Sequence, residues 1–228
     1  MSRLVWDNTG EHKFEMGVSR GVLYVAKDTV LTTDTSRYNT GVVWNGLTGV
    51  TNSPDGAEPT DLWADNIKYA TLRSAETFGA TIEAYTYPDE FGVCDGSVDV
   101  STNSTYGVRI GQQARKAFGF CYRTELGNDQ NPNAGYLIHI IYNCTASPSE
   151  RNYETVNDSP DAITFSWEIN SNPVAVTSHK PTSEIIIDST KLTSAKLTAI
   201  ENLLYGSESG SATLPDPDLV ISTINNAT

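Results

Sequence analysis

Residues 162–169 read AITFSWEI, and this stretch gives the clearest indication of the fold. Ile163, Phe165, Trp167 and Ile169 alternate with small or polar residues. A period of two with aromatic and β-branched side chains on one side is typical of a half-buried β-strand. The stretch therefore predicts one strand of a sheet that covers a hydrophobic core.

The same alternation occurs in residues 117–124, AFGFCYRT, where Phe118, Phe120 and Tyr122 share one face. Shorter β-rich runs lie between turn-forming segments, at residues 21–26, 41–44, 67–72, 136–143 and 184–188. Helical periodicity is scarce, and long helical crossovers are missing between these runs. We therefore predict a mainly β chain with antiparallel pairing.

One helix is predicted near the C-terminus, in the run TSAKLTAIENLLYG. Thr193 is a suitable N-cap and Gly206 a suitable stop. The apolar positions form one stripe with a fourth residue beside it: Leu197, Ile200 and Leu204, with Leu203. A helix of about a dozen residues is marginal in isolation, so we expect this stripe to pack on the sheet.

The 228 residues favour a single domain, over residues 1–206. We expect residues 1–20 to form an N-terminal arm and residues 207–228 an extended C-terminal arm. Residues 45–65, NGLTGVTNSPDGAEPTDLWAD, are polar and rich in turn residues, and they predict a long irregular loop. Loops of this length are usually functional or become ordered by a partner.

The composition argues against several classes of protein. Acidic residues outnumber basic ones 28 to 15, which gives a formal charge of −13 and disfavours gripping nucleic acid through a basic face. No apolar run approaches a membrane span, and the first residues lack a secretory signal, so we expect a cytosolic site of synthesis. Cys94, Cys121 and Cys144 form no C-x-x-C pair and predict buried, reduced thiols.

Catalytic and metal-binding motifs are missing. The sequence contains no phosphate-binding P-loop, nucleophile elbow, zinc-protease motif or dinucleotide fingerprint. His139 lies in the apolar run YLIHIIYN, where a histidine is more often packed and hydrogen-bonded than catalytic. We therefore expect no enzyme activity, no cofactor and no metal.

Residues 80–91, ATIEAYTYPDEF, are the strongest argument for an enzyme, because glycoside hydrolysis needs two carboxylates across a sugar. Glu83 falls on the polar face of a predicted strand, and Asp89 and Glu90 fall in the turn that follows. A strand with an acidic turn is the better interpretation, and a Glu83–Asp89 glycosidase is the weakest alternative. A carbohydrate-binding β-sandwich is the second alternative, with possible stacking platforms at Trp44, Trp63, Tyr85 and Tyr87.

Several blocks occur in one order and resemble the major tail protein, or tail tube protein, of long non-contractile-tailed bacteriophages. They begin with VVWNGLTGVTNSPDGAEPTDLWADNIKY (42–69), SAETFGATIEAYTYPDEF (74–91) and VRIGQQARKAFGFCYRTELGND (108–129), and continue through residues 135–176 and 184–206. The resemblance covers most of the chain after about residue 40, and it is far more specific than any short motif above.

The resemblance implies two packed antiparallel sheets flanked by a helix. It further implies a six-fold ring whose subunits together form an inner β-barrel, with rings stacking into a tube. The implied partners are other copies of the chain, a tape measure protein, and tail tip and tail terminator proteins. Double-stranded DNA would pass through without specific binding. The protein would belong to the virion tail, assembled in the host bacterial cytoplasm.

Two groups of residues acquire expected roles from the resemblance. The long loop is expected to reach the next ring through Thr51, Asn52, Ser53, Pro54, Asp55, Gly56 and Glu58. Some of the acids that follow it are expected to face the channel and repel DNA: Glu76, Glu83, Asp89, Glu90 and Asp95. An acidic wall would keep the DNA centred and mobile, because it offers the phosphates no cation to bind.

Overall fold

The computed structural model describes residues 4–29, 36–56, 58–100, 107–153, 155 and 161–227. The strands are β1 (Lys13–Val25), β2 (Val42–Trp44), β3 (Leu47–Asn52), β4 (Asp55–Gly56), β5 (Pro59–Ala64), β6 (Ile67–Arg73), β7 (Glu76–Ala84), β8 (Val98–Asp99), β9 (Arg109–Ile110), β10 (Phe118–Asn128), β11 (Gly135–Ala146), β12 (Phe165–Ser171) and β13 (Glu184–Asp188). The helices are α1 (Ser194–Tyr205) and α2 (Pro217–Asn226), with short 3-10 turns η1 (Asp89–Val93) and η2 (Ser189–Lys191).

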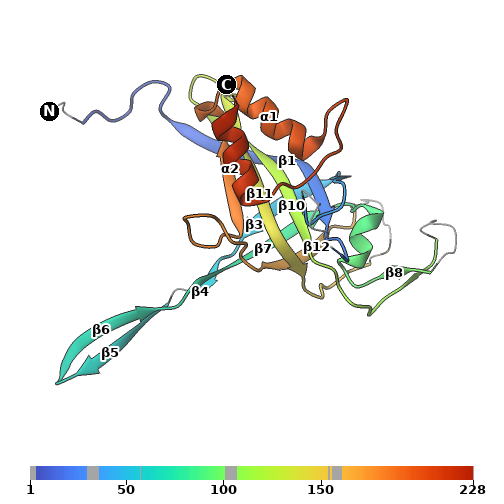
Figure 1. The fold of residues 1–228 in the computed structure, drawn as a ribbon, viewed down its shortest axis with the longest axis horizontal. Helices are drawn as coiled ribbons and strands as arrows, with labels where there is room; N and C mark the ends of the chain where they lie inside the picture. The colour runs from blue at the N-terminus through green and yellow to red at the C-terminus, as the bar shows by residue number, and fades with distance from the viewer. Residues whose placement is uncertain are drawn as a thin grey trace.

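One large antiparallel sheet organises the chain, in the order β2-β1-β10-β11-β12-β7-β3. β13 also pairs with β11, and β4 continues the pairing along β7. The helices α1 and α2 lie against one side of β10 and β11, while β5 and β6 extend away from the body as a separate ribbon (Figure 1). The mainly β, antiparallel class predicted from the sequence is confirmed; the described strands do not close into a barrel within one chain.

The sheet separates two hydrophobic clusters. The first lies between the two halves of the folded sheet and contains Trp44, Phe91, Phe118, Phe120 and Trp167 among its buried side chains. Trp44 packs against Phe91 with ring centroids 4.6 Å apart and against Trp167 at 5.5 Å. The second cluster lies between the opposite face of β10 and β11 and the two helices. The molecule is therefore layered as sheet, sheet and helices.

Asn143 changes which of the two clusters the even-numbered residues of β11 face. Its backbone has φ +48°, a left-handed conformation in the middle of β11. Tyr142 belongs to the helix-side cluster, whereas Cys144, two residues later, belongs to the cluster between the sheets. Residues two apart in a regular strand face the same side, so the turn at Asn143 exchanges the two faces. It also divides β11 between two neighbours, since Leu137 to Ile141 pair with β13 and Cys144 to Ala146 pair with β12.

The strand predicted over residues 162–169 is β12, which begins later, at Phe165. Trp167 and Ile169 are buried, as the alternation predicted, and Phe165 is partly buried. Ile163 lies before the strand and is 39% exposed. The three buried positions of β12 are paired with buried or partly buried positions of β7: Trp167 with Ile82, Ile169 with Ala80 and Ser171 with Phe78. The partly buried Phe165 is paired with the buried Ala84.

The predicted helix is confirmed as α1. The Thr193 hydroxyl caps it by accepting a hydrogen bond from the Lys196 amide, and Gly206 ends it with φ +85°. Ile200 and Leu204 are buried against the sheet, and Leu197 and Leu203 are partly buried. The Tyr24 hydroxyl of β1 donates to the Leu204 carbonyl over 2.5 Å, which ties the last turn of the helix to the sheet.

Two segments differ from the expectation of irregular structure. Much of the predicted loop is strand: Leu47–Asn52 form β3 of the main sheet, Asp55–Gly56 form β4 and Pro59–Ala64 form β5. β4 and β5 are exposed at every position, so they lack the alternation that marks a half-buried strand. The expected C-terminal arm contains α2, which begins with Pro217 at its first turn and buries Val220 in the helix-side cluster. A helix of ten residues depends on such packing, which local sequence does not reveal.

Substitution of Asn143 should distinguish the backbone requirement from the side-chain contact. We expect Asn143→Val to lower the free energy of unfolding by about 2 kcal/mol, because a β-branched residue disfavours positive φ. Asn143→Gly should cost less than about 1 kcal/mol, since glycine accepts the conformation and loses only the 3.3 Å bond from Nδ2 to the Asn172 carbonyl. Urea unfolding followed by tryptophan fluorescence measures both, and equal losses would contradict the assigned role.

Candidate assembly surfaces

The β5–β6 ribbon is exposed along almost its whole length. It turns at Asp65 and Asn66, both with positive φ (51° and 65°), as a two-residue hairpin turn requires. Its large hydrophobic side chains are exposed to solvent over 41–74% of their area: Leu62, Trp63, Ile67, Tyr69 and Leu72. A two-stranded ribbon is marginally stable by itself, so this one is well suited to packing against a partner.

The pairing register gives the ribbon two different faces. Leu62 pairs with Ala70, Thr60 with Leu72 and Ala64 with Ile67, which places the aliphatic side chains together. We call this set the ribbon's apolar face: Leu62, Ala64, Ile67, Ala70 and Leu72. The opposite face pairs Asp61 with Thr71, and the Asp61 carboxylate binds Lys68 Nζ at 2.7 Å. The apolar face is therefore free of carboxylates.

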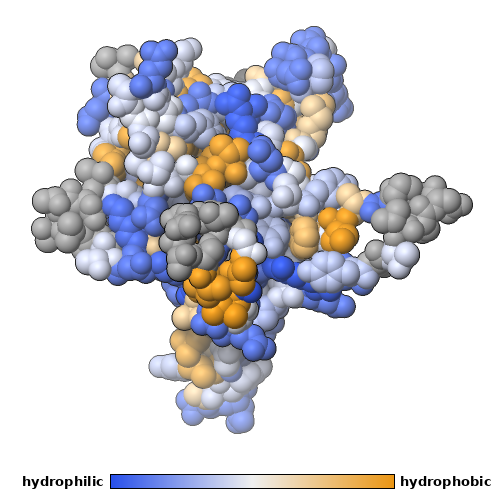
Figure 2. All heavy atoms as spheres, turned by 90° about the vertical axis from the view of Figure 1, so that its right-hand side faces the viewer, coloured by the Kyte–Doolittle hydropathy of each residue, from blue (hydrophilic) through white to orange (hydrophobic). Residues whose placement is uncertain are grey.

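A second apolar surface lies on β8 and β9. Val98 pairs with Ile110, and the Val100 amide donates to the Val108 carbonyl over 3.0 Å. These four side chains, which we call the β8–β9 quartet, are 37–60% exposed. Figure 2 views the molecule from the right-hand side of Figure 1, where β8 lies, and shows orange hydrophobic atoms gathered at the surface.

The seven residues expected to reach the next ring lie in the stem that leads to the β5–β6 ribbon. Thr51 and Asn52 end β3, Asp55 and Gly56 form β4, and Glu58 precedes β5. Ser53 donates its amide to the Gly79 carbonyl over 2.8 Å, and Pro54 follows it. The stem therefore carries the ribbon outward, and the tip of the ribbon lies further along, around Asp65.

The five acids expected to face a channel have different surroundings. Glu76 and Glu83 project from β7 and are exposed, and Glu90 is partly exposed in η1. Asp89 forms an ion pair with Arg109. Asp95 is 11% exposed and forms ion pairs with Arg151 and, at 3.5 Å, with Arg115. The structure thus distinguishes exposed carboxylates on β7 from ion-paired ones near η1. The clustering of acidic residues in the sequence did not reveal this distinction.

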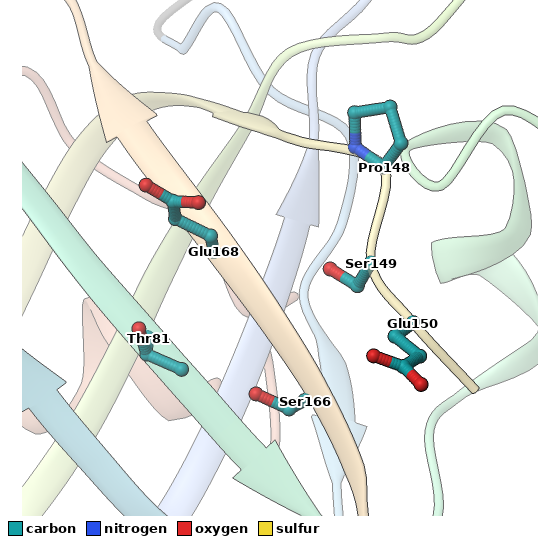
Figure 3. A pocket seen from close by; sticks show the side chains of 6 residues that line it. All are labelled: Thr81, Pro148, Ser149, Glu150, Ser166 and Glu168. Atoms are coloured by element: carbon teal, nitrogen blue, oxygen red, sulfur yellow. The ribbon is translucent and has the colours of Figure 1, made fainter. Parts of the chain in front are cut away.

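Glu83 belongs to a polar sheet face built by β7 and β12. Ser166 is opposite Glu83 and Glu168 is opposite Thr81, so Glu83 and Glu168 are diagonal neighbours. Figure 3 shows Thr81, Ser166 and Glu168 beside Glu150, around a shallow hollow of about 350 Å³. An adjoining hollow of about 230 Å³ adds Asp55 and Asn170. Neither hollow is lined by lysine or arginine among the described residues, so we call this surface the acidic sheet face.

The residues considered for sugar binding do not form a platform. Trp44 is 2% exposed within the first hydrophobic cluster, and its indole Nε1 donates to the Thr86 carbonyl. Tyr87 packs edge-on against Phe165 and Trp167. Trp63 and Tyr85 are exposed, on the projecting ribbon and just after β7 respectively. Trp44 is therefore a core residue.

His139 is packed and hydrogen-bonded, as predicted. It is 6% exposed and stacks on Tyr122 with ring centroids 4.5 Å apart. Its ring nitrogens lie 3.1 Å from the Thr124 hydroxyl and 3.2 Å from a Glu184 carboxylate oxygen. These contacts connect β10, β11 and β13.

The three cysteines are free and buried, as predicted. Burial raises the pKa of the Cys94 thiol and of the Cys121 thiol to about 12, and it raises that of Cys144 as well. The thiols are therefore protonated near neutral pH and shielded from reagents in solution.

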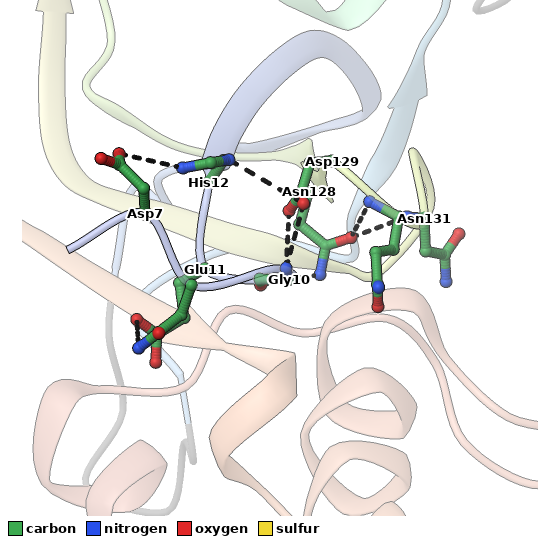
Figure 4. Close-up of polar contacts among 9 residues, drawn as sticks. Asp7, Gly10, Glu11, His12, Asn128, Asp129 and Asn131 are labelled. Carbon is green, nitrogen blue, oxygen red and sulfur yellow. Dashed lines mark hydrogen bonds and ion pairs between the residues drawn. The ribbon is translucent and has the colours of Figure 1, made fainter. Parts of the chain in front are cut away.

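The described part of the N-terminal arm is attached to the end of the β10–β11 hairpin (Figure 4). The Gly10 amide donates to both carboxylate oxygens of Asp129, at 2.9 and 3.0 Å, and Asn128 Nδ2 donates to the Gly10 carbonyl. The Gly10 hydrogen bond lowers the pKa of the Asp129 carboxyl. From Lys13 onward the expected arm is part of β1, in the central sheet.

The described residues contain no cluster of histidine, cysteine and carboxylate side chains suited to a metal ion. None of the described helices has the length and apolarity needed to cross a membrane.

No protein-family model matches the sequence, and the comparison with curated proteins gives no match. Among solved structures, a chain of the anti-feeding prophage baseplate aligns with 84% of this chain and 100% of its own length, at 8% identity and a TM-score of 0.35. A chain of the sheath–tube complex of an extracellular contractile injection system, PVC, in the extended state aligns with 74% of this chain and 88% of its own, at 11% identity and a TM-score of 0.30. Likeness of this degree carries no argument about function.

Neutralising one paired and one exposed acid should separate their roles. We expect Asp95→Asn to lower the free energy of unfolding by about 2–3 kcal/mol, because it leaves Arg115 and Arg151 without a partly buried counter-charge. Glu83→Gln should change it by less than about 0.5 kcal/mol, because Glu83 is exposed. Urea unfolding measures both values. A small loss for Asp95→Asn would show that its ion pairs contribute little.

Proposed function

We propose that the chain is a structural, non-enzymatic subunit of a phage tail tube, which assembles into stacked hexameric rings around a channel for DNA. The observation that carries this proposal is the projecting β5–β6 ribbon, whose apolar face has no cover among the described residues of its own chain. The sequence resemblance to siphophage tail tube proteins names the kind of assembly in which such a ribbon is needed.

The edges of the main sheet support assembly into rings. β2 and β3 lie at the two ends of its strand order, and β13 pairs with β11 alone among the described strands. An exposed edge offers unpaired backbone groups to a strand of another chain. Ile186 of β13 is 52% exposed, so this edge also offers an apolar side chain. Pairing of such edges between neighbours would close a barrel that one chain leaves open.

The acidic sheet face is suited to lining the DNA channel. Glu83, Glu150 and Glu168 lie on it without lysine or arginine in the lining of its hollows. A wall of this kind provides no cation for the phosphates, so DNA would not bind to it. Asp89 and Asp95 contribute less to the field, because arginines compensate their charges. The proposed channel acids are thus Glu83 and its neighbours on the sheet, with Glu76 further along β7.

The remaining partners follow from the same proposal. A tail tube subunit would meet a tape measure protein inside the growing tube, and tail tip and tail terminator proteins at its two ends, within the virion. The alternative of a carbohydrate-binding module loses support because Trp44 is buried in the core. A glycan array tests that alternative directly.

Electron microscopy of the purified protein over a range of salt concentrations tests assembly. We expect hollow tubes with a regular ring repeat, forming more readily as salt screens the repulsion between chains of charge −13. Leu62→Ser with Leu72→Ser should abolish them, since burying two leucines in a contact contributes about 3 kcal/mol or more, roughly a hundredfold in affinity. Thr71→Ser, on the opposite face of the ribbon, is the control and should assemble normally. Tubes from the double variant would remove the ribbon from the assembly.

Reversing charge on the acidic sheet face tests its orientation. Wild-type tubes assembled with short DNA duplexes should retain none of them after sedimentation. Tubes of the Glu83→Lys, Glu168→Lys variant should retain duplexes at low salt, protected from nuclease, and release them as salt rises. Retained DNA that remains open to nuclease would place this face on the outside of the tube instead.

A further inference from the structure

The β8–β9 hairpin exposes its apolar side chains to solvent, which is unusual for a surface element. Its four aliphatic side chains face outward, whereas the charged pair between them, Asp99 and Arg109, lies on the opposite face. Arg109 is directed at the body: it forms an ion pair with Asp89 of η1, and its Nη1 lies 4.0 Å from the position that a Cβ on Gly92 would occupy. A sheet with one solvated face normally places its polar side chains there.

Hydrogen bonds hold this hairpin to the body in that orientation. The Ser97 amide donates to the Gly92 carbonyl over 2.8 Å, and the Gln113 amide donates to the Gly96 carbonyl over 2.9 Å. These bonds fix the chain just before β8 and just after β9. The hairpin therefore cannot rotate about its long axis to bury its valines. The β8–β9 quartet is consequently presented outward and available for packing.

The charges around the two apolar surfaces allow another copy of this chain to be the partner. Two chains of charge −13 repel each other, so contact is favoured where few carboxylates are exposed or where they are paired. Both apolar surfaces satisfy this condition. Asp61 binds Lys68 behind the ribbon's apolar face, and Asp89 binds Arg109 behind the β8–β9 quartet. A basic partner would gain nothing from surfaces whose charges are already compensated.

The two surfaces cannot meet within one molecule. β5–β6 and β8–β9 lie at opposite ends of the longest axis in Figure 1. Each is a two-stranded ribbon that lacks a second layer, and face-to-face packing of two such ribbons would supply it. A contact between different surfaces at opposite ends repeats from copy to copy, as a tube requires, whereas a surface that pairs with itself stops at a dimer.

We propose that the apolar face of the β5–β6 ribbon packs on the β8–β9 quartet of a second copy of this chain. This inference rests on the proposed function, because it names the site that receives the ribbon in the assembly. The contact is heterologous: each subunit donates its ribbon to one neighbour and receives a ribbon from another. It makes Val98, Val100, Val108 and Ile110 the receiving surface.

Cross-linking of the full-length chain tests the contact. The native thiols are buried and shielded from maleimides, so only the introduced cysteines should react. Chains carrying Ile67→Cys and chains carrying Val108→Cys are mixed and treated with a short bismaleimide. We expect a cross-linked dimer from the mixture and no dimer from either variant alone. A mixture of Ile67→Cys with Asn202→Cys, on the exposed side of α1, is the matched control and should stay monomeric.

A second pair of variants tests the energetics. Val100→Asp with Val108→Asp should abolish assembly, while Val100→Ile with Val108→Ile, which keeps the surface apolar, should preserve assembly. Circular dichroism should show that both pairs are folded, as expected for exposed positions. Normal assembly by the aspartate pair would overturn the proposal.

The outcomes distinguish failure of the proposed contact from failure of the proposed tube assembly. A dimer formed by Val108→Cys alone would show that the quartet pairs with itself, which overturns the heterologous contact. Wild-type tubes that give no cross-link in the mixture would leave the tube standing and refute this contact. Conversely, a cross-linked mixture from a wild-type protein that never forms tubes would support the contact and count against the tube.

Discussion

The fold depends on one backbone conformation, the positive φ of Asn143 in β11. A regular strand would keep Tyr142 and Cys144 on the same face, and Cys144 and Ala146 would then leave the cluster between the sheets. Because Asn143 exchanges the faces, the first part of β11 serves the helix-side cluster through even-numbered residues and the last part serves the cluster between the sheets. β12, β7 and β3 can then fold over β1 and β10.

That folded sheet accounts for the elements that extend from it. β7 is long enough to pair with β12 and β3 near the core and with β4 further out, so its outer end carries the chain away toward the β5–β6 ribbon. η1 inserts Phe91 among Trp44, Phe118 and Trp167, which closes the first cluster and leaves Asp89 and Asp95 at its border. The ion pairs of Asp89 and Asp95 anchor the adjoining segments, and so the same core positions both apolar surfaces.

Electrostatics and hydrophobic burial favour the same kind of assembly. A chain of charge −13 gains solubility from repulsion and can associate only through surfaces where charge is absent or compensated. The ribbon's apolar face and the β8–β9 quartet are such surfaces, while no lysine or arginine is among the described residues that line the hollows of the acidic sheet face. Subunits of this kind would meet through their ends and keep their carboxylates in water, where a passing anionic polymer would find no binding site.

The sequence by itself determined the elements whose signals are local. Alternation in AITFSWEI and AFGFCYRT marked two core strands, and the Thr193 cap with the Gly206 stop bounded α1, because capping and burial period act within a few residues. Only the tertiary structure decided the rest. β3 joined the main sheet by pairing with β7, β5 became part of a ribbon by pairing with β6, and α2 packed on α1. Asp95 forms ion pairs with arginines distant in sequence, whereas Glu83 is exposed. Such long-range contacts leave no periodic trace in the sequence, which is why the density of acids predicted a channel face but not which carboxylates are exposed.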